Sequence, residues 1–176
     1  MSQITLPEIV LLAQGFGMCA RRNQRRKFEY APYMVHPIRV ACIVDEYTDD
    51  ANVIAAAMMH DVLEDTDATA EEMPRVIGDP ITDLVLEVTD VSRPSDGKRA
   101  VRKEKDRGHL AKSSPGGATI KLADVIDNTV GIAEHDKGFA PVYLREAEAL
   151  LPVLKHGDKR VWERARDTLK AAREQL

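Results

Sequence analysis

The strongest constraint on the fold is the apolar run Val53-Ile54-Ala55-Ala56-Ala57-Met58-Met59. We predict that it lies on a helix from Ala51 to about Leu63, for which Asp49-Asp50 offer an N-cap. A helix that is apolar nearly all round has no face suited to water, so this helix should be central and buried. His60 and Asp61 follow the run directly. The sequence therefore predicts an imidazole and a carboxylate beside the core.

The rest of the chain is also predicted to be helical. Aromatic residues are few, and no segment alternates apolar with polar side chains as a strand would. Because the length suits one domain, we predict an all-α bundle forming a single compact domain over residues 1–176, with a C-terminal helix over 158–175 packed on it. Pro37 is expected to start the second helix, with His36 just outside as its cap. The other expected helices span 8–20, 38–47, 69–78, 81–89, 98–110, 118–134 and 141–151.

Composition bears on several classes of protein. The net charge of −4 argues against general nucleic-acid binding, which needs a basic surface. No apolar run approaches the roughly 20 residues of a membrane span, and the N-terminus lacks the pattern of a secretory signal. We therefore expect a cytoplasmic protein that acts on a small molecule. Cys19 and Cys42 lie in apolar helical stretches and are expected to be buried free thiols. A monomer or weak homo-oligomer is expected. Leu150, Leu151, Leu154 and Trp162 could pack internally or line a dimer contact, and we favour the internal core.

Two imidazoles and two carboxylates can close around one divalent metal: His36, His60, Asp61 and Asp124. His60 and Asp61 are about 100° apart around a helix axis, so both can lean toward one point beside it. Mixed imidazole and carboxylate ligation suits Mn²⁺, Fe²⁺ or Zn²⁺ better than Mg²⁺. An open coordination position would hold water, whose pKa the metal would lower. The sequence therefore predicts a metal-dependent phosphohydrolase.

Two further carboxylates, Glu64 and Asp65, follow one helical turn after His60 and Asp61. Positions four apart share a helix face, so either acid could accept a proton from the attacking water. Each residue also has a structural explanation when taken alone: a hydrogen-bonded core histidine, acids that end a helix, or a solvated Asp124. Burying an unpaired carboxylate is costly, however, and acids near a helix C-terminus oppose its dipole. The combination favours the metal site.

The same residues belong to a longer series of motifs, and with them the chain resembles the hydrolase domain of RelA/SpoT homologues. In length it is similar to the stand-alone small alarmone hydrolases, which belong to the HD superfamily. The Glu-Asp-Thr extension after His60-Asp61 and the block from Ser113 onward are the most specific parts. The resemblance covers about residues 5 to 155 and implies an HD-domain helical bundle. Its motifs are Gln24–Lys27, Pro32–Ile38, His60–Thr66, Val88–Asp90, Ser113–Gly116, and Lys121–Asp124 with Asn128.

The resemblance implies a one-metal site, usually Mn²⁺, that removes the 3′ pyrophosphate from guanosine tetra- or pentaphosphate. By motif, the ligands would be His36, His60, Asp61 and Asp124, while Glu64 and Asp65 would position and deprotonate the water. A polyanionic substrate also needs a basic rim for capture. The resemblance places Arg26 beside the base, Lys27 near the phosphates, Asn128 at the ribose or 3′ phosphate, Tyr143 at the ribose, and Arg99, Arg102 and Lys103 near the distal phosphates.

The chain departs from the family pattern at Val125, at Asp127 and in the loop that carries Tyr30. These positions belong to the base and ribose region, so the choice between a guanosine and an adenosine alarmone stays open. A second hypothesis is an HD phosphohydrolase for another nucleotide, such as a nucleoside monophosphate or NADPH. A third is a non-catalytic nucleotide-binding helical protein. The intact ligands and acids, and the Glu64-Asp65-Thr66 extension, favour the alarmone hydrolase.

Overall fold

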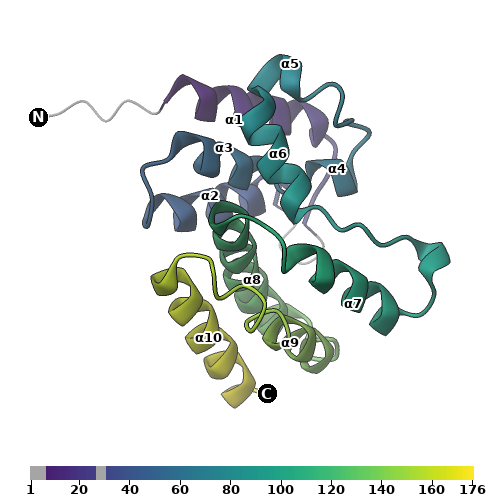
Figure 1. Cartoon of the computed structure of the whole chain (residues 1–176). Coiled ribbons are helices and arrows are strands. Elements are labelled where there is room, and N and C mark those ends of the chain that lie inside the picture. Colours follow the sequence, from purple (N-terminus) through teal and green to yellow (C-terminus); the bar gives the residue numbers. More distant parts are fainter. Residues whose placement is uncertain (1–6, 27–30) are drawn as a thin grey trace, which may run out of the picture. The chain divides into compact units, whose positions relative to one another are not determined.

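A computed structural model describes residues 7–26 and 31–176. These residues form helices and no strand; their one β-type pairing is an isolated bridge between Arg25 and Pro32 (Figure 1). The prediction of an all-α fold is thereby confirmed. The chain divides into two compact units, Met1–Leu86 and Glu87–Leu176. The assignment of residues 1–176 to a single domain stays a prediction.

Helix α3 forms the centre of the first unit. It packs against α1 and α2, and every residue from Val53 to Met59 is buried, as the apolar run predicts. Asp50 caps α3 by accepting a hydrogen bond from the backbone N–H of Asn52 at 2.9 Å. The unit contains α1 (Glu8–Ala20), α2 (Val35–Asp45), α3 (Ala51–Met59), α4 (Val62–Asp65) and α5 (Pro74–Ile77), and α6 (Asp79–Val88) crosses into the second unit.

The helix expected to reach Leu63 ends earlier, and that prediction is wrong. After Met59, His60 and Asp61 form a turn, and Asp61 adopts φ −101° and ψ 4° before α4 begins. Nδ1 of His60 lies 2.8 Å from the carbonyl oxygen of Ala57, the acceptor that the N–H of Asp61 would use in a continuing helix. The side chain thus competes with the backbone for that acceptor. Consequently the pair His60-Asp61 and the acid pair Glu64-Asp65 are not carried on one unbroken helix.

The start of α2 also differs from expectation. The helix begins at Val35 with Met34 as its N-cap, so His36 lies within the first turn and is not a cap. Pro37 is accommodated there because the N–H groups of the first turn have no partner within the helix. The backbone N–H of His36 donates instead to the carbonyl of Tyr33 at 3.1 Å. His36 is therefore held by a helix backbone.

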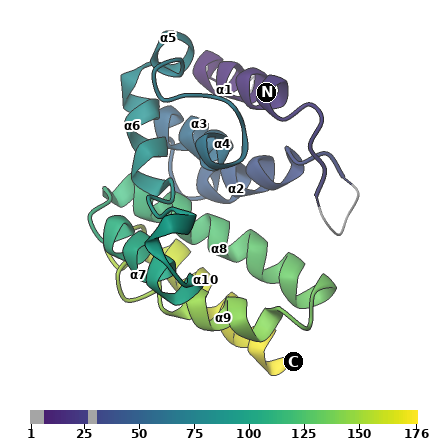
Figure 2. The ribbon, with the colours of Figure 1, turned by 90° about the vertical axis from the view of Figure 1, so that its right-hand side faces the viewer.

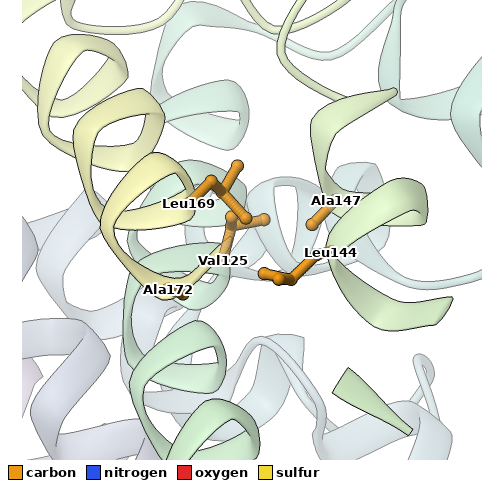
Figure 3. Close-up of a cluster of buried hydrophobic side chains, with 5 residues drawn as sticks. All are labelled: Val125, Leu144, Ala147, Leu169 and Ala172. Carbon is orange, nitrogen blue, oxygen red and sulfur yellow. The ribbon is translucent and has the colours of Figure 1, made fainter. Parts of the chain in front are cut away.

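Helices α8, α9 and α10 lie side by side in the second unit (Figure 2). Val125 of α8 meets Leu144 and Ala147 of α9 and Leu169 and Ala172 of α10 in a buried cluster (Figure 3). Leu150 and Leu151 pack against this cluster, and Leu154 is fully buried. The unit contains η1 (Pro94–Asp96), α7 (Arg99–Leu110), α8 (Pro115–His135), α9 (Ala140–Glu148) and α10 (Lys159–Glu174).

Both cysteines are exposed, against expectation. On α1 the buried positions are Val10, Ala13 and Gly17, and Cys19 lies off that face. The apolar character of the segment was therefore a poor guide to which of its sides meets the core.

None of the helices in the described part of the chain combines the length and the apolarity that crossing a membrane requires.

The cluster around Leu169 should contribute strongly to the stability of the second unit. Leu169 is 1% exposed, so Leu169→Ala removes packed methyl groups and leaves a cavity. We expect the free energy of unfolding to fall by about 2–5 kcal/mol in urea denaturation. Val130→Ala is the control, because Val130 is 56% exposed on α8, and its effect should stay within about 0.5 kcal/mol. Equal losses in the two variants would contradict this account of the core.

Candidate metal centre and active site

Three side chains of types that can bind a metal lie together in the first unit. The Oδ2 atom of Asp61 lies 3.1 Å from Nε2 of His60 and 3.5 Å from Nε2 of His36. The two imidazole rings are 5.0 Å apart in an edge-to-face arrangement, and each histidine is 1% exposed. The first turn of α2 supplies one histidine, and the turn between α3 and α4 supplies the other two residues. The sequence prediction that these three groups lie together agrees with this geometry.

The hydrogen bond of His60 determines which of its nitrogens faces the cluster. Nδ1 can reach the Ala57 carbonyl at 2.8 Å only as an N–H donor, so in the neutral ring Nε2 carries the lone pair. A lone pair 3.1 Å from a carboxylate oxygen would be repulsive unless a cation or a proton lay between them. A histidine that donates one ring N–H to a backbone carbonyl and keeps its other nitrogen unprotonated is typical of metal-ligating histidines. The three residues therefore have the donor chemistry of a divalent-metal site.

Asp124, the fourth predicted ligand, belongs to the second unit. It lies on α8 and is 5% exposed. Lys121 Nζ is 2.8 Å from its Oδ2, and Asn128 donates to its Oδ1 at 2.5 Å. The charge of this buried carboxylate is thus partly balanced within its own helix. Its participation in the metal site stays a prediction.

The two predicted catalytic acids, Glu64 and Asp65, lie on α4 and are both exposed. They line a surface hollow together with Phe16 of α1 and Gln24 from the segment that follows α1. Asp65 is connected to Asp61 through Tyr33. The hydroxyl of Tyr33 lies 2.9 Å from Oδ2 of Asp65 and 3.2 Å from Oδ2 of Asp61. Asp65 and the three residues His36, His60 and Asp61 thus form one network within the first unit.

The sequence predictions gave no role to Tyr33. Burial, followed by the charges of Asp61 and Asp65, raises the pKa of this tyrosine above its ordinary value. Its hydroxyl therefore remains a proton donor at neutral pH. The residue lies within the Pro32–Ile38 stretch that carries the family resemblance, which was a signal for its importance but not for its function. Arg21, which approaches Asp65 from the end of α1, had no such signal.

The basic residues predicted on α7 all lie on that helix, and at least two of them have acidic partners. Arg99 makes a bidentate pair with Glu146, with both N–O distances at 2.7 Å. Lys103 Nζ lies 2.8 Å from Oδ2 of Asp90. The side chain of Arg102 is half-buried. Contact of these three side chains with a substrate stays a prediction.

The remaining predicted substrate contacts are divided between the two units. Asn128 is bonded to Asp124, and the Tyr143 hydroxyl donates to the carbonyl of Val125 at 3.4 Å. Burial, and then the charge of Asp124, raises the pKa of Tyr143. Arg26 is half-buried, and its backbone N–H donates to the carbonyl of Ala31. Lys27 and the Tyr30 departure lie outside the described residues.

The family model of the HD domain matches residues 16–114, a span that includes both histidines and Asp61. The chain belongs to the HD domain family. Similar proteins confirm the predicted resemblance to the hydrolase domain of RelA/SpoT homologues, of the small alarmone hydrolase type. The motif pair of the family corresponds here to His60-Asp61.

Two curated relatives and one solved structure illustrate the relationship. Guanosine-3′,5′-bis(diphosphate) 3′-pyrophosphohydrolase MESH1 of Drosophila melanogaster is 41% identical over 110 residues, which cover 61% of this chain and 60% of that protein. MESH1 of Danio rerio is 38% identical over 124 residues, which cover 68% of this chain and 67% of that protein. The structure of a metazoan ortholog of SpoT, described as hydrolysing ppGpp, matches with a TM-score of 0.85 at 29% identity. That match covers 98% of this chain and 99% of the other.

Proposed function

We propose that this HD-family protein is a metal-dependent hydrolase that removes the 3′ pyrophosphate from (p)ppGpp-like alarmones of guanosine or adenosine type. The observation that carries the proposal is the network in the first unit. One carboxylate, Asp61, approaches two buried imidazoles within 3.5 Å, and Tyr33 connects it to the acid Asp65. Relatives named for this reaction are 38–41% identical, which supports the choice of substrate class.

We also propose that His36, His60, Asp61 and Asp124 hold one divalent metal, Mn²⁺ in the working enzyme. Two imidazoles with carboxylates form a donor set that suits Mn²⁺. The buried carboxylate of Asp124 supports its inclusion, since such a group requires compensation by cations. A divalent metal bound by these residues supplies Lewis acidity, which lowers the pKa of water and polarises a phosphoryl oxygen.

The acids on α4 carry the proton transfer in this proposal. A water oxygen attacks the phosphorus attached to the ribose 3′ oxygen, the bond between that oxygen and phosphorus breaks, and pyrophosphate is released. Asp65 or Glu64 accepts the proton that the water loses, and the leaving 3′ oxygen takes up one proton, so the step balances. Tyr33 holds Asp65 at 2.9 Å, which fixes the acid for this transfer.

For the substrate we propose contacts from Arg26, Lys27, Arg102, Lys103, Asn128 and Tyr143. Arg99 is the weakest member of the predicted set, because Glu146 engages its guanidinium from two nitrogens. Contact with a phosphate would require that pair to open. The other residues offer cationic or hydrogen-bonding groups that suit a ribose and its phosphates.

The direct test is product analysis with guanosine and adenosine alarmones side by side, with Mn²⁺ and with a chelator. We expect pyrophosphate and a nucleotide with a free 3′ hydroxyl, formed only when metal is present. Release of inorganic phosphate alone from another nucleotide would favour a different HD phosphohydrolase. Metal-loaded protein that leaves every alarmone intact would contradict the proposal.

A further inference from the structure

Arg21 is a buried arginine next to a proposed catalytic acid. It is the C-cap residue of α1, and its side chain is only 1% exposed. Its Nη1 donates to Oδ2 of Asp65 at 3.4 Å, across 44 positions of sequence. Its Nη2 is buried without a hydrogen-bond partner among the described residues. Asp65 on α4 is thus an anionic partner of this guanidinium.

Two further side chains hold the same pair in place. Nη1 of Arg21 also donates to Oε1 of Gln24 at 3.1 Å, while Nε2 of Gln24 donates to the backbone carbonyl of Asp65 at 2.5 Å. The guanidinium carbon lies 4.3 Å from the centre of the Tyr33 ring. The hydroxyl of that ring donates to the same Oδ2 of Asp65. One carboxylate oxygen therefore receives both an arginine and a tyrosine.

Arg21 and Asp65 each need the other, one for its charge and one for its orientation. Arginine stays charged in proteins, so a buried guanidinium requires a carboxylate to balance it. Asp65 lies on a helix of four residues and its side chain is 44% exposed, so the packing around it cannot fix its direction. The hydrogen bonds from Arg21 and Tyr33 supply that direction. Because Tyr33 also reaches Asp61, the same contacts set the acid relative to a proposed metal ligand.

We propose that Arg21 and Tyr33 are positioning residues that hold Asp65 in the orientation it needs to accept the proton of the attacking water. The inference rests on the proposed function, because the orientation of Asp65 matters for the rate only if that acid takes part in hydrolysis. It concerns the rate of the chemical step.

The test is a set of double-mutant cycles on the metal-loaded full chain with a guanosine alarmone. Arg21→Gln and Tyr33→Phe should each lower kcat by about 10- to 100-fold, with KM nearly unchanged. In an Asp65→Asn background the same substitutions should cause almost no further loss, because they act through that acid. Arg21→Lys, which keeps the charge, should recover part of kcat.

Val10→Ala serves as the matched control, since it loosens the buried face of α1 without touching the acid. It should lower the melting temperature and leave kcat unchanged. If Arg21→Gln does not fold, Tyr33→Phe, which removes a single hydroxyl, carries the test. Losses that multiply in full with Asp65→Asn, or single variants with wild-type kcat, would overturn this inference and leave the proposed function standing. A wild-type protein without activity would instead overturn the proposed function and this inference together.

Discussion

Replacing His60 by alanine is expected to abolish hydrolysis, with a loss in kcat/KM of about 10³-fold or more. Its Nε2 faces Asp61 at 3.1 Å, and its Nδ1 is held by the Ala57 carbonyl. The variant thus removes the best-oriented nitrogen of the proposed metal site. Mn²⁺ titration should show weakened binding, and kinetics at saturating Mn²⁺ should show the loss of rate.

The control for this prediction is His135→Ala. That histidine lies at the end of α8, and its side chain is 34% exposed, so activity and Mn²⁺ affinity should stay at the wild-type level. Melting temperatures in the presence of a chelator separate a loss of ligand from a loss of fold. Wild-type Mn²⁺ affinity in a folded His60→Ala protein would rule out this histidine as a ligand.

The apolar run of α3 predicted burial reliably, because its composition alone leaves no polar side for water. The run from Val53 to Met59 is apolar on all sides, so no tertiary arrangement can leave it exposed without a large cost. The end of the same helix could not be predicted in this way. It depends on one side chain, His60, that takes the backbone acceptor of its own preceding turn. Neither propensity nor pattern describes such a contact.

The candidate site shows the same division. His36, His60 and Asp61 were recognisable because their residue types and the motif spacing point to one kind of chemistry, and they do converge. The contact between Arg21 and Asp65 joins positions 44 apart, and its sequence context is only a basic stretch. Such long-range partners are set by how α1 and α4 pack. They therefore become visible only when both helices are placed.

The ion pairs on α7 illustrate a further limit of the sequence. A basic helix predicts an anion-binding surface and a solvated charged face equally well. In the structure Arg99 and Lys103 have the acidic partners Glu146 and Asp90. Such exposed pairs contribute little to stability, so they can open when a polyanion competes. The basic residues of α7 could be identified from the sequence, but their acidic partners depend on how the helices pack.

Replacing Asp124 by asparagine is the second change with a large expected effect. Substitutions of groups that only orient a ligand commonly reduce metal affinity 10- to 100-fold, so loss of a ligating carboxylate should cost at least about 100-fold. We expect a comparable loss in kcat/KM at limiting Mn²⁺. Asparagine keeps the shape and one acceptor oxygen, so the ammonium of Lys121, which lies 2.8 Å from Asp124, can still donate a hydrogen bond there and the fold should persist.

Glu134→Gln is the matched control for Asp124→Asn, because it neutralises another acid of α8 whose side chain is 68% exposed. Its Mn²⁺ affinity should equal that of the wild type, which excludes a general effect of charge on the helix. If Asp124→Asn bound Mn²⁺ as tightly as the wild type, the metal would be held without this carboxylate. The ligands would then be confined to the first unit, and the buried charge of Asp124 would be explained by Lys121 and Asn128 alone. The predicted loss in His60→Ala would still hold, so the two variants test the two parts of the proposed metal site independently.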